Sequence, residues 1–334
     1  MADQASRRVT QPSAGYPQFS LTKQRFDQKT YSGRLLRCFE VTDPRSLFTK
    51  ESKLQHSIQL LNDFQKGLHN KNVTDKELWE AKRIKEAIIH PDTNKKILMP
   101  FRMSGYVPFG TITVVGMLLP APSLKTVIFW QWINQSHNAL VNYSNRNASK
   151  PTPISKFLLS YTGAITSAVT IAVGLSNLIK KTNFSNPMIK SLAQRLVAYP
   201  ATATANICNI VLMRNQELFT GIDVKDKDGN IIGTSKIAAR NAIFETALTR
   251  IFLPAPVLII PALVMAPLER THFLKIRPKL HLPVQAAVCV VVFGIALPFA
   301  IAMFPQESQI LTTDLEPEIQ SNTLETMLYY NKGL

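Results

Sequence analysis

Stretches without a charged side chain alternate along this chain with strongly charged segments. They cover residues 103–124, 126–145, 157–179, 196–213, 251–268 and 280–306. A helix needs about 20 such residues to cross the hydrocarbon core of a bilayer, and soluble domains rarely contain six stretches of this length. The pattern predicts an all-α, polytopic membrane protein with five transmembrane helices, or six if residues 126–145 also cross. That stretch is rich in amides, so a tilted, re-entrant or interfacial helix is the alternative there.

The first hundred residues are different, because they are charged and contain no long apolar run. The change in composition predicts four regions. We expect a flexible tail over residues 1–20, which are rich in Gln, Ser, Pro and Gly, and a soluble helical region over residues 21–99. A transmembrane helical bundle follows over residues 100–306, and an acidic C-terminal tail over residues 307–334.

Two amphipathic helices are predicted inside the soluble region. The first ends at Gly67 and carries apolar side chains at helical spacing, namely Leu54, Ile58, Leu61 and Phe64. The second begins at a capping-box pattern formed by Thr74 and Glu77 and ends before Pro91, which restricts the residue that precedes it.

The formal net charge of +16 raises the question of nucleic acid, but the cations do not cluster as phosphate binding requires. Many flank the apolar stretches, where Lys and Arg favour anionic lipid headgroups. We therefore expect membrane lipid, including anionic lipid, as a partner and no nucleic acid. The three cysteines are far apart, and no nucleotide-binding, metal-binding or catalytic motif is found. We expect no enzyme activity, cofactor or metal.

Amide side chains form a stripe on the predicted helix over residues 126–145. At 100° per residue, one arc of roughly 100° contains Gln131, Asn134, Gln135, Asn138, Asn142 and Asn145. Six amides exceed what one packing seam needs, so we take Asn134, Asn138 and Asn142 as candidate substrate-binding residues. The alternative is that the stripe only joins helices through hydrogen bonds.

A second polar stripe lies on the helix predicted over residues 196–213, close to Pro200. It consists of Arg195, Thr202, Asn206 and Asn209. A cation at the mouth, followed by a hydroxyl and two amides, suits a substrate that carries a carboxylate. The alternative for Arg195 is an ordinary snorkelling side chain at a helix end.

Three further features bear on structure or gating. In the sequence HPDT, His90 and Asp92 are a candidate gate, because an imidazole near a carboxylate can titrate near physiological pH. Alternatively, Asp92 or Thr93 caps the next turn while Pro91 shapes the chain. Prolines at 254, 256, 261 and 267 are expected to kink or break a helix. The loop over residues 223–234 fails as a calcium site and is expected to form a β-turn around Asp228, Gly229 and Asn230.

Several segments resemble the sideroflexins, a family of multi-spanning proteins of the mitochondrial inner membrane. They are DPRSLF, HPDTNKKILMPFRMSGYVPFG, FWQWINQSHNALVNYSNRNA, ANICNIVLMR, DGNIIGTSKIAAR and YYNKGL. The resemblance runs from about residue 20 to the C-terminus. PFRMSGY and His137 resemble the citrate-associated branch of the family rather than the serine-importing one. The resemblance implies solute transport across that membrane without a cofactor or ATP site, and it brings no agreed substrate site.

We therefore expect a carrier for a small carboxylate metabolite, with citrate or a related tricarboxylate as the leading substrate and serine as the alternative. A non-transporting membrane scaffold or assembly factor is the second alternative. In a carrier the polar stripes should converge on a wet cavity, whereas in a scaffold they should pair with one another. The sequence does not indicate the oligomeric state.

Overall fold

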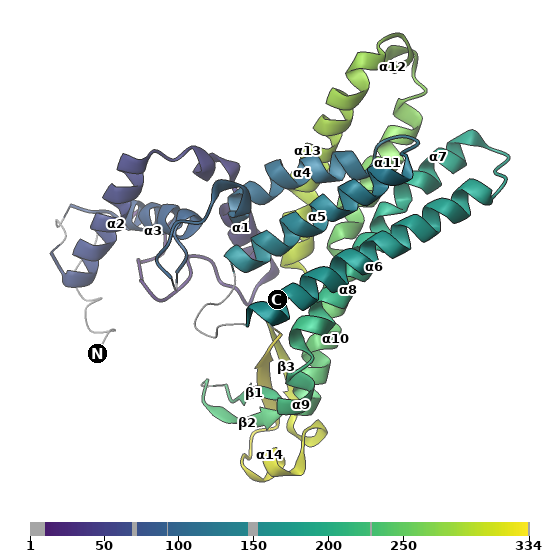
Figure 1. Cartoon of the computed structure of the whole chain (residues 1–334). Coiled ribbons are helices and arrows are strands. Elements are labelled where there is room, and N and C mark those ends of the chain that lie inside the picture. The colour runs from purple at the N-terminus through teal and green to yellow at the C-terminus, as the bar shows by residue number, and fades with distance from the viewer. Residues whose placement is uncertain (1–10, 69–71, 92, 146–152, 228, 333–334) are drawn as a thin grey trace. The chain divides into compact units, whose positions relative to one another are not determined.

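The computed structural model describes residues 11–68, 72–91, 93–145, 153–227 and 229–332. The chain forms two compact units (Figure 1). The first consists of Met1–Gly110 and Leu140–Pro151, and the second of Thr111–Ala139 and Thr152–Leu334. Asp92 and Asp228, which the sequence assigned to a candidate gate and to a turn, lie outside the described residues.

The first unit is helical and has its own apolar core. It contains α1 (Tyr31–Thr42), η2 (Pro44–Phe48), α2 (Glu51–Lys66), α3 (Asp75–Ile88), η3 (Met99–Phe101) and η4 (Met103–Gly105). The predicted capping box of Thr74 and Glu77 is confirmed, and α2 ends at Gly67 with a φ of 72°. Phe19 and Trp79 pack edge to face in the core, with ring centroids 4.9 Å apart.

The second unit contains the long helices, with α4 and α5 extending into the first. In chain order these are α4 (Tyr106–Met117), α5 (Leu124–Ser144), α6 (Ile154–Lys181), α7 (Pro187–Leu196), α8 (Ala198–Arg214), α9 (Glu217–Thr220), α10 (Lys236–Phe252), α11 (Pro254–Leu268), α12 (His272–Ile276), η5 (Pro278–Leu280) and α13 (His281–Ala302). Helices α6 and α8 pack closely through small side chains, since Ala164, Ala168 and Ala205 share one buried cluster.

Four helical segments among the described residues are long and apolar enough to cross a membrane. They are Ile154–Lys181, Pro187–Arg214, Lys236–Leu268 and Pro278–Ala302. The predicted count of five or six is not confirmed. Helix α4 has only 12 residues, about 18 Å at 1.5 Å per residue, and Pro120 and Pro122 follow its end. Helix α5 has 21 residues, but its amides keep it outside this apolar class.

In two of these segments the helical hydrogen bonding is interrupted next to prolines while the backbone stays helical, as expected for residues that lack a backbone donor. Helices α7 and α8 are separated by Val197, three residues before Pro200, and α10 and α11 by Leu253, just before Pro254. At 33 residues, the continuous α10–α11 segment is about 50 Å long and exceeds a hydrocarbon core of about 30 Å. Its charged first half therefore extends beyond the core.

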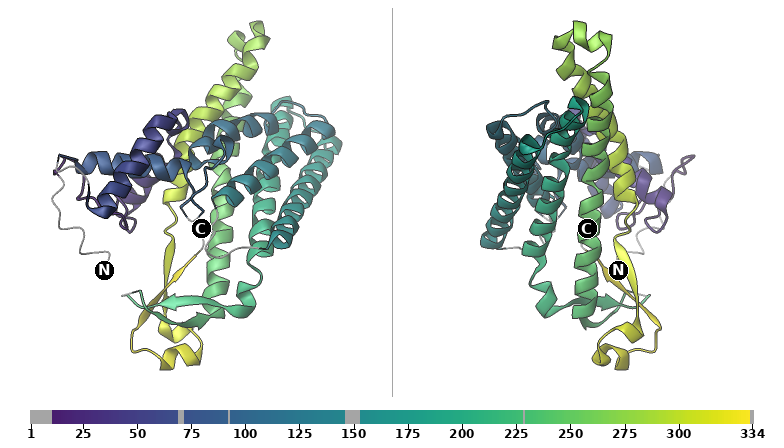
Figure 2. Two further views of the ribbon diagram at one scale, coloured as in Figure 1. Left: turned by 60° about the vertical axis from the view of Figure 1, so that its left-hand side comes forward. Right: turned by 90° about the vertical axis from the view of Figure 1, so that its right-hand side faces the viewer.

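The expectation of an all-α fold is wrong in one respect, because the second unit contains a four-stranded sheet. The strands are β1 (Ile222–Lys225), β2 (Ile231–Ser235), β3 (Glu307–Leu311) and β4 (Met327–Asn331), paired antiparallel in the order β2-β1-β4-β3. The acidic C-terminal segment thus supplies two strands, with η6 (Thr312–Asp314) and α14 (Pro317–Ser321) between them. Within this unit the sheet and the α12 hairpin lie at opposite ends of the helices (Figure 2).

The sheet forms because its strands have a shared apolar face to bury. Val224, Ile310, Leu328 and Tyr330 form one cluster with Ala238 and Ala242 of α10. Between β1 and β2, the Asp226 amide donates to the Asn230 carbonyl at 3.0 Å and the Gly229 amide donates to the Asp226 carbonyl at 3.2 Å.

Candidate functional site

The first half of the amide stripe on α5 faces the interior of the second unit. Gln131, Asn134 and Gln135 are all buried. The Thr113 hydroxyl of α4 donates to Asn134 Oδ1 at 3.1 Å. An interhelical hydrogen bond of this kind is expected if the stripe only joins helices. The bond uses the oxygen of the Asn134 amide and not its nitrogen.

Several buried polar atoms nearby have no hydrogen-bond partner among the described residues. They are Gln131 Oε1, Asn134 Nδ2, Gln135 Nε2, Gln285 Oε1, Arg195 Nε and Arg195 Nη1. Gln285 of α13 uses its other group to donate to the Val115 carbonyl of α4 at 3.3 Å. A buried polar group without a partner costs about 1–3 kcal/mol, so six such atoms are poor packing for a static scaffold.

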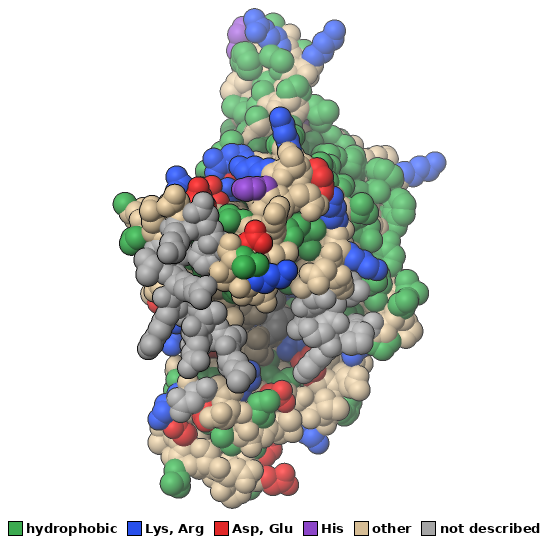
Figure 3. Space-filling model, turned by 90° about the vertical axis from the view of Figure 1, so that its left-hand side faces the viewer, with side chains coloured by type: hydrophobic (Ala, Val, Ile, Leu, Met, Phe, Trp, Pro, Cys, Tyr) green, Lys and Arg blue, Asp and Glu red, His purple; other side chains and the backbone are tan. Residues whose placement is uncertain are grey.

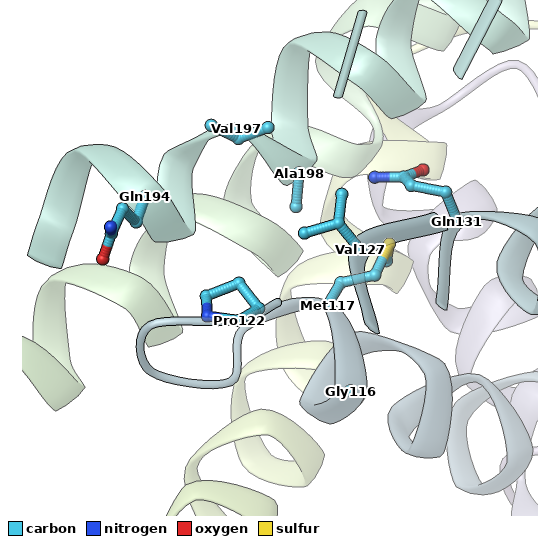
Figure 4. Close-up of a pocket in the computed structure, with 8 residues that line it drawn as sticks. All are labelled: Gly116, Met117, Pro122, Val127, Gln131, Gln194, Val197 and Ala198. Carbon is cyan, nitrogen blue, oxygen red and sulfur yellow. The ribbon is translucent and has the colours of Figure 1, made fainter. Parts of the chain in front are cut away.

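A small cavity lies among α4, α5, α7 and α8. It is lined by Gly116, Met117, Pro122, Val127, Gln131, Gln194, Val197 and Ala198, and the Gln131 amide points toward Ala198 (Figure 4). The cavity has a volume of about 10 Å³, roughly the space of one water molecule. The structure is therefore closed around this point, and a metabolite would enter only after the helices move.

Arg195 lies at the end of α7 and forms the charged part of the site. Its side chain is fully buried, so it does not snorkel, and its Nη2 group pairs with Glu269 Oε1. The same carboxylate oxygen also contacts Nε2 of His281, the first residue of α13. The side chains of Glu269 and His281 are 20% and 23% exposed. Three ionisable side chains from three parts of the chain thus meet at one carboxylate oxygen.

Gln131 is the one residue of the two stripes that lines this cavity, and none of the candidate substrate-binding residues does. Thr202 is buried and its hydroxyl lies 4.0 Å from the Met117 sulfur. Asn138, Asn206 and Asn209 are half-buried, while Asn142 is exposed. The structure therefore brings Gln131 next to Gln194 and Val197, which flank Arg195 in the sequence. It does not group the amides of α8 with them, and these residues stay predictions.

Pro91 and Thr93 of the HPDT segment lie in turns of the first unit. His90 is buried, its amide donates to the Lys95 carbonyl at 2.9 Å, and its Nδ1 accepts from the Thr93 amide at 3.3 Å. Helix α3 ends at Ile88, before Pro91, as predicted. These bonds show how His90 and Thr93 shape the chain, and a gating role for the segment stays a prediction.

Sequence reasoning missed Glu269, His281, Gln285 and Thr113. A signal for Glu269 was present, because it is the only acidic residue between Glu245 and Glu307. Glu269 ends an apolar segment at the basic tip around α12. The exposed cations of this tip are Arg270, Lys275, Arg277 and Lys279. Lys and Arg side chains gather at the top of Figure 3. Cations in this position suit anionic headgroups at a membrane surface.

The arrangement offers both charged and neutral hydrogen-bonding groups. Arg195 has N–H groups that a carboxylate can accept from, and the surrounding amides both donate and accept. No group of three or more His, Cys, Asp or Glu side chains with metal-binding geometry is present in the described part of the chain.

Comparison with known proteins supports the resemblance noted in the sequence. The family model for sideroflexins matches residues 20–334. The human protein named Sideroflexin-5 is 56% identical over 318 residues, which are 95% of this chain and 94% of that protein. The Caenorhabditis elegans Sideroflexin-5 is 51% identical over 96% of each chain, and the sheep Sideroflexin-1 is 38% identical over 95% of this chain and 98% of that protein. No solved structure matches.

Proposed function

Because this chain belongs to the sideroflexin family of multi-pass membrane proteins, whose members are generally transporters, we propose that it carries a small carboxylate metabolite across the mitochondrial inner membrane. Citrate or a related tricarboxylate is the leading substrate. The observation that carries this proposal is Arg195, a fully buried cation whose Nε and Nη1 groups have no partner among the described residues. A substrate carboxylate would supply the missing acceptors.

The unpaired amides support transport over a purely structural role. Gln131, Asn134 and Gln285 come from two helices, and each retains an unused buried donor or acceptor. In a scaffold these groups would be expected to satisfy one another, since each unsatisfied group lowers stability. In a carrier they contact water or substrate once the helices open, and neutral amides do so without the desolvation cost of buried ions.

Serine is the second candidate substrate, and one contact favours it. Glu269 lies beside Arg195, so the pair presents a carboxylate and a guanidinium together. An amino acid carries the complementary pair of charges, with its ammonium group suited to Glu269 and its carboxylate to Arg195.

Uptake into proteoliposomes tests the proposal. Purified protein is reconstituted, and uptake of labelled citrate and labelled serine is compared with that of empty liposomes. We expect saturable citrate uptake that weakens in Arg195→Lys, because an ammonium group cannot reproduce the guanidinium fork. The exposed Arg277→Lys is the matched control and should transport normally. Uptake of serine without citrate would identify serine as the substrate. Uptake of neither compound by folded protein would favour a non-transporting scaffold.

A further inference from the structure

Arg195, Glu269 and His281 meet in a way that does not balance the donors and acceptors of a simple ion pair. Both Arg195 Nη2 and His281 Nε2 contact the same oxygen, Oε1 of Glu269. With a neutral imidazole that donates through Nε2, the Nδ1 atom of His281 is free to accept a proton. The triad then has a net charge of zero before protonation and of +1 after it.

We propose that this triad is the proton-coupling site of the carrier, so that a carboxylate substrate is transported together with a proton. This inference rests on the proposed function. A net charge inside the protein is expensive in a low-dielectric surrounding. A proton on His281 and a substrate carboxylate on Arg195 offset each other, so each favours binding of the other. Protonated His281 also attracts the Glu269 carboxylate more strongly, and the ion pair between Glu269 and Arg195 is then weaker.

The exposure of the three groups matches these roles. The Arg195 side chain is fully buried, whereas those of Glu269 and His281 are partly exposed, so protons reach the triad from water while the cation stays in the interior. Helix α11 packs against both α7 and α13, and the three groups therefore link elements that have to separate when the site opens.

Among the ionisable groups near His281, Glu269 is its main interaction partner. On the packed helices they are Lys190 of α7, which is half-buried, and Cys289 of α13, which is buried. Arg270, His272, Lys275, Arg277 and Lys279 belong to the exposed tip. On α10, Arg250 lies 19 positions before Glu269, about 28 Å along a continuous helix. The tip is basic, and Glu269 is the acidic group that contacts His281.

Proton movement is measured directly in proteoliposomes that contain a pH-sensitive dye. Addition of citrate to wild-type protein should acidify the interior, and citrate uptake should fall as the outside pH rises, by at most tenfold per pH unit for one required proton. Glu269→Gln removes the carboxylate that contacts His281 and gives the triad a permanent net charge of +1, as in its protonated state. It should transport citrate with little acidification and a flatter pH dependence, and it also controls for the titration of citrate itself. His281→Gln should lose acidification, whereas His272→Gln at the exposed tip should behave as wild type.

The outcomes separate the two proposals. Citrate uptake by wild-type protein without acidification at any pH overturns the coupling and leaves the carrier intact. Acidification that persists in both Glu269→Gln and His281→Gln overturns the assignment to this triad. Absence of citrate uptake by folded wild-type protein overturns the proposed substrate and the coupling together. The first and third outcomes need only wild-type protein. The proposal can therefore be refuted even if a variant fails to fold.

Discussion

The C-terminal strand is expected to depend on one acidic side chain, Glu245 of α10. Its Oε1 accepts from the Tyr330 hydroxyl at 2.6 Å, and its Oε2 accepts from the Ser308 hydroxyl at 2.8 Å and pairs with Lys332 Nζ at 2.7 Å. Removal of one partner from a buried ion pair costs about 3–5 kcal/mol. Glu245 is partly exposed, so we take the lower end and expect Glu245→Ala to destabilise docking of the strand by about 3 kcal/mol.

The sheet offers a matched control in Lys227, which pairs with Glu325 at 2.9 Å. The Lys227 side chain is 64% exposed, against 7% for Lys332, and exposed pairs contribute about 0–1 kcal/mol. Hydrogen exchange in detergent measures the difference. In Glu245→Ala the amides of β3 and β4 should exchange about a hundredfold faster, since about 1.4 kcal/mol corresponds to a factor of ten, while Lys227→Ala should change them little. Equal effects of the two substitutions would refute the reasoning.

Two further predictions concern packing and pH. A Cβ atom at Gly116 would overlap the ring of Trp130, so Gly116→Ala should lower stability by about 1–3 kcal/mol, whereas Gly174→Ala, which meets nothing within 4 Å, should not lower it; equal melting temperatures would contradict this. Hydrogen bonding from Arg45 lowers the pKa of Asp43. The stability from this carboxylate is therefore present above the ordinary aspartate pKa of about 3.9 and is lost as the pH falls through the lowered value. Asp43→Asn should flatten the acid-side decline in the melting temperature of the first unit, and an unchanged decline would count against it.

Local signals in the sequence predicted much of the helical structure. The capping box at Thr74 and the stop at Gly67 were readable because they depend on a few neighbouring residues. The number of membrane helices was harder, because uncharged composition does not set helix length. Residues 103–124 contain no charge, yet α4 stops at Met117 before Pro120 and Pro122. The two prolines were the available sign of an early end.

Features that depend on distant partners were not readable in the same way. The strands over Glu307–Leu311 and Met327–Asn331 are short, and their place in a sheet depends on β1 more than 80 residues earlier. For the site, the helical period placed the α5 amides on one face, and the structure buries Gln131, Asn134 and Gln135 while Asn142 is exposed. The period did not show that Arg195 pairs with Glu269, because that contact joins positions 74 residues apart.

Thiol labelling from water tests most directly whether the buried polar groups form a transport path. Single cysteines are introduced as Asn134→Cys and Thr166→Cys in a background where Cys38, Cys208 and Cys289 are replaced, and a membrane-impermeant reagent is applied to the reconstituted protein. Asn134 is buried in the structure and Thr166 is exposed on α6. A carrier predicts labelling at position 134 that citrate slows. Any labelling at position 166, which lines an open pocket between α6 and α8, should not respond to citrate. Labelling at 166 with none at 134, in folded protein, would contradict the account and make the α5 stripe a packing seam.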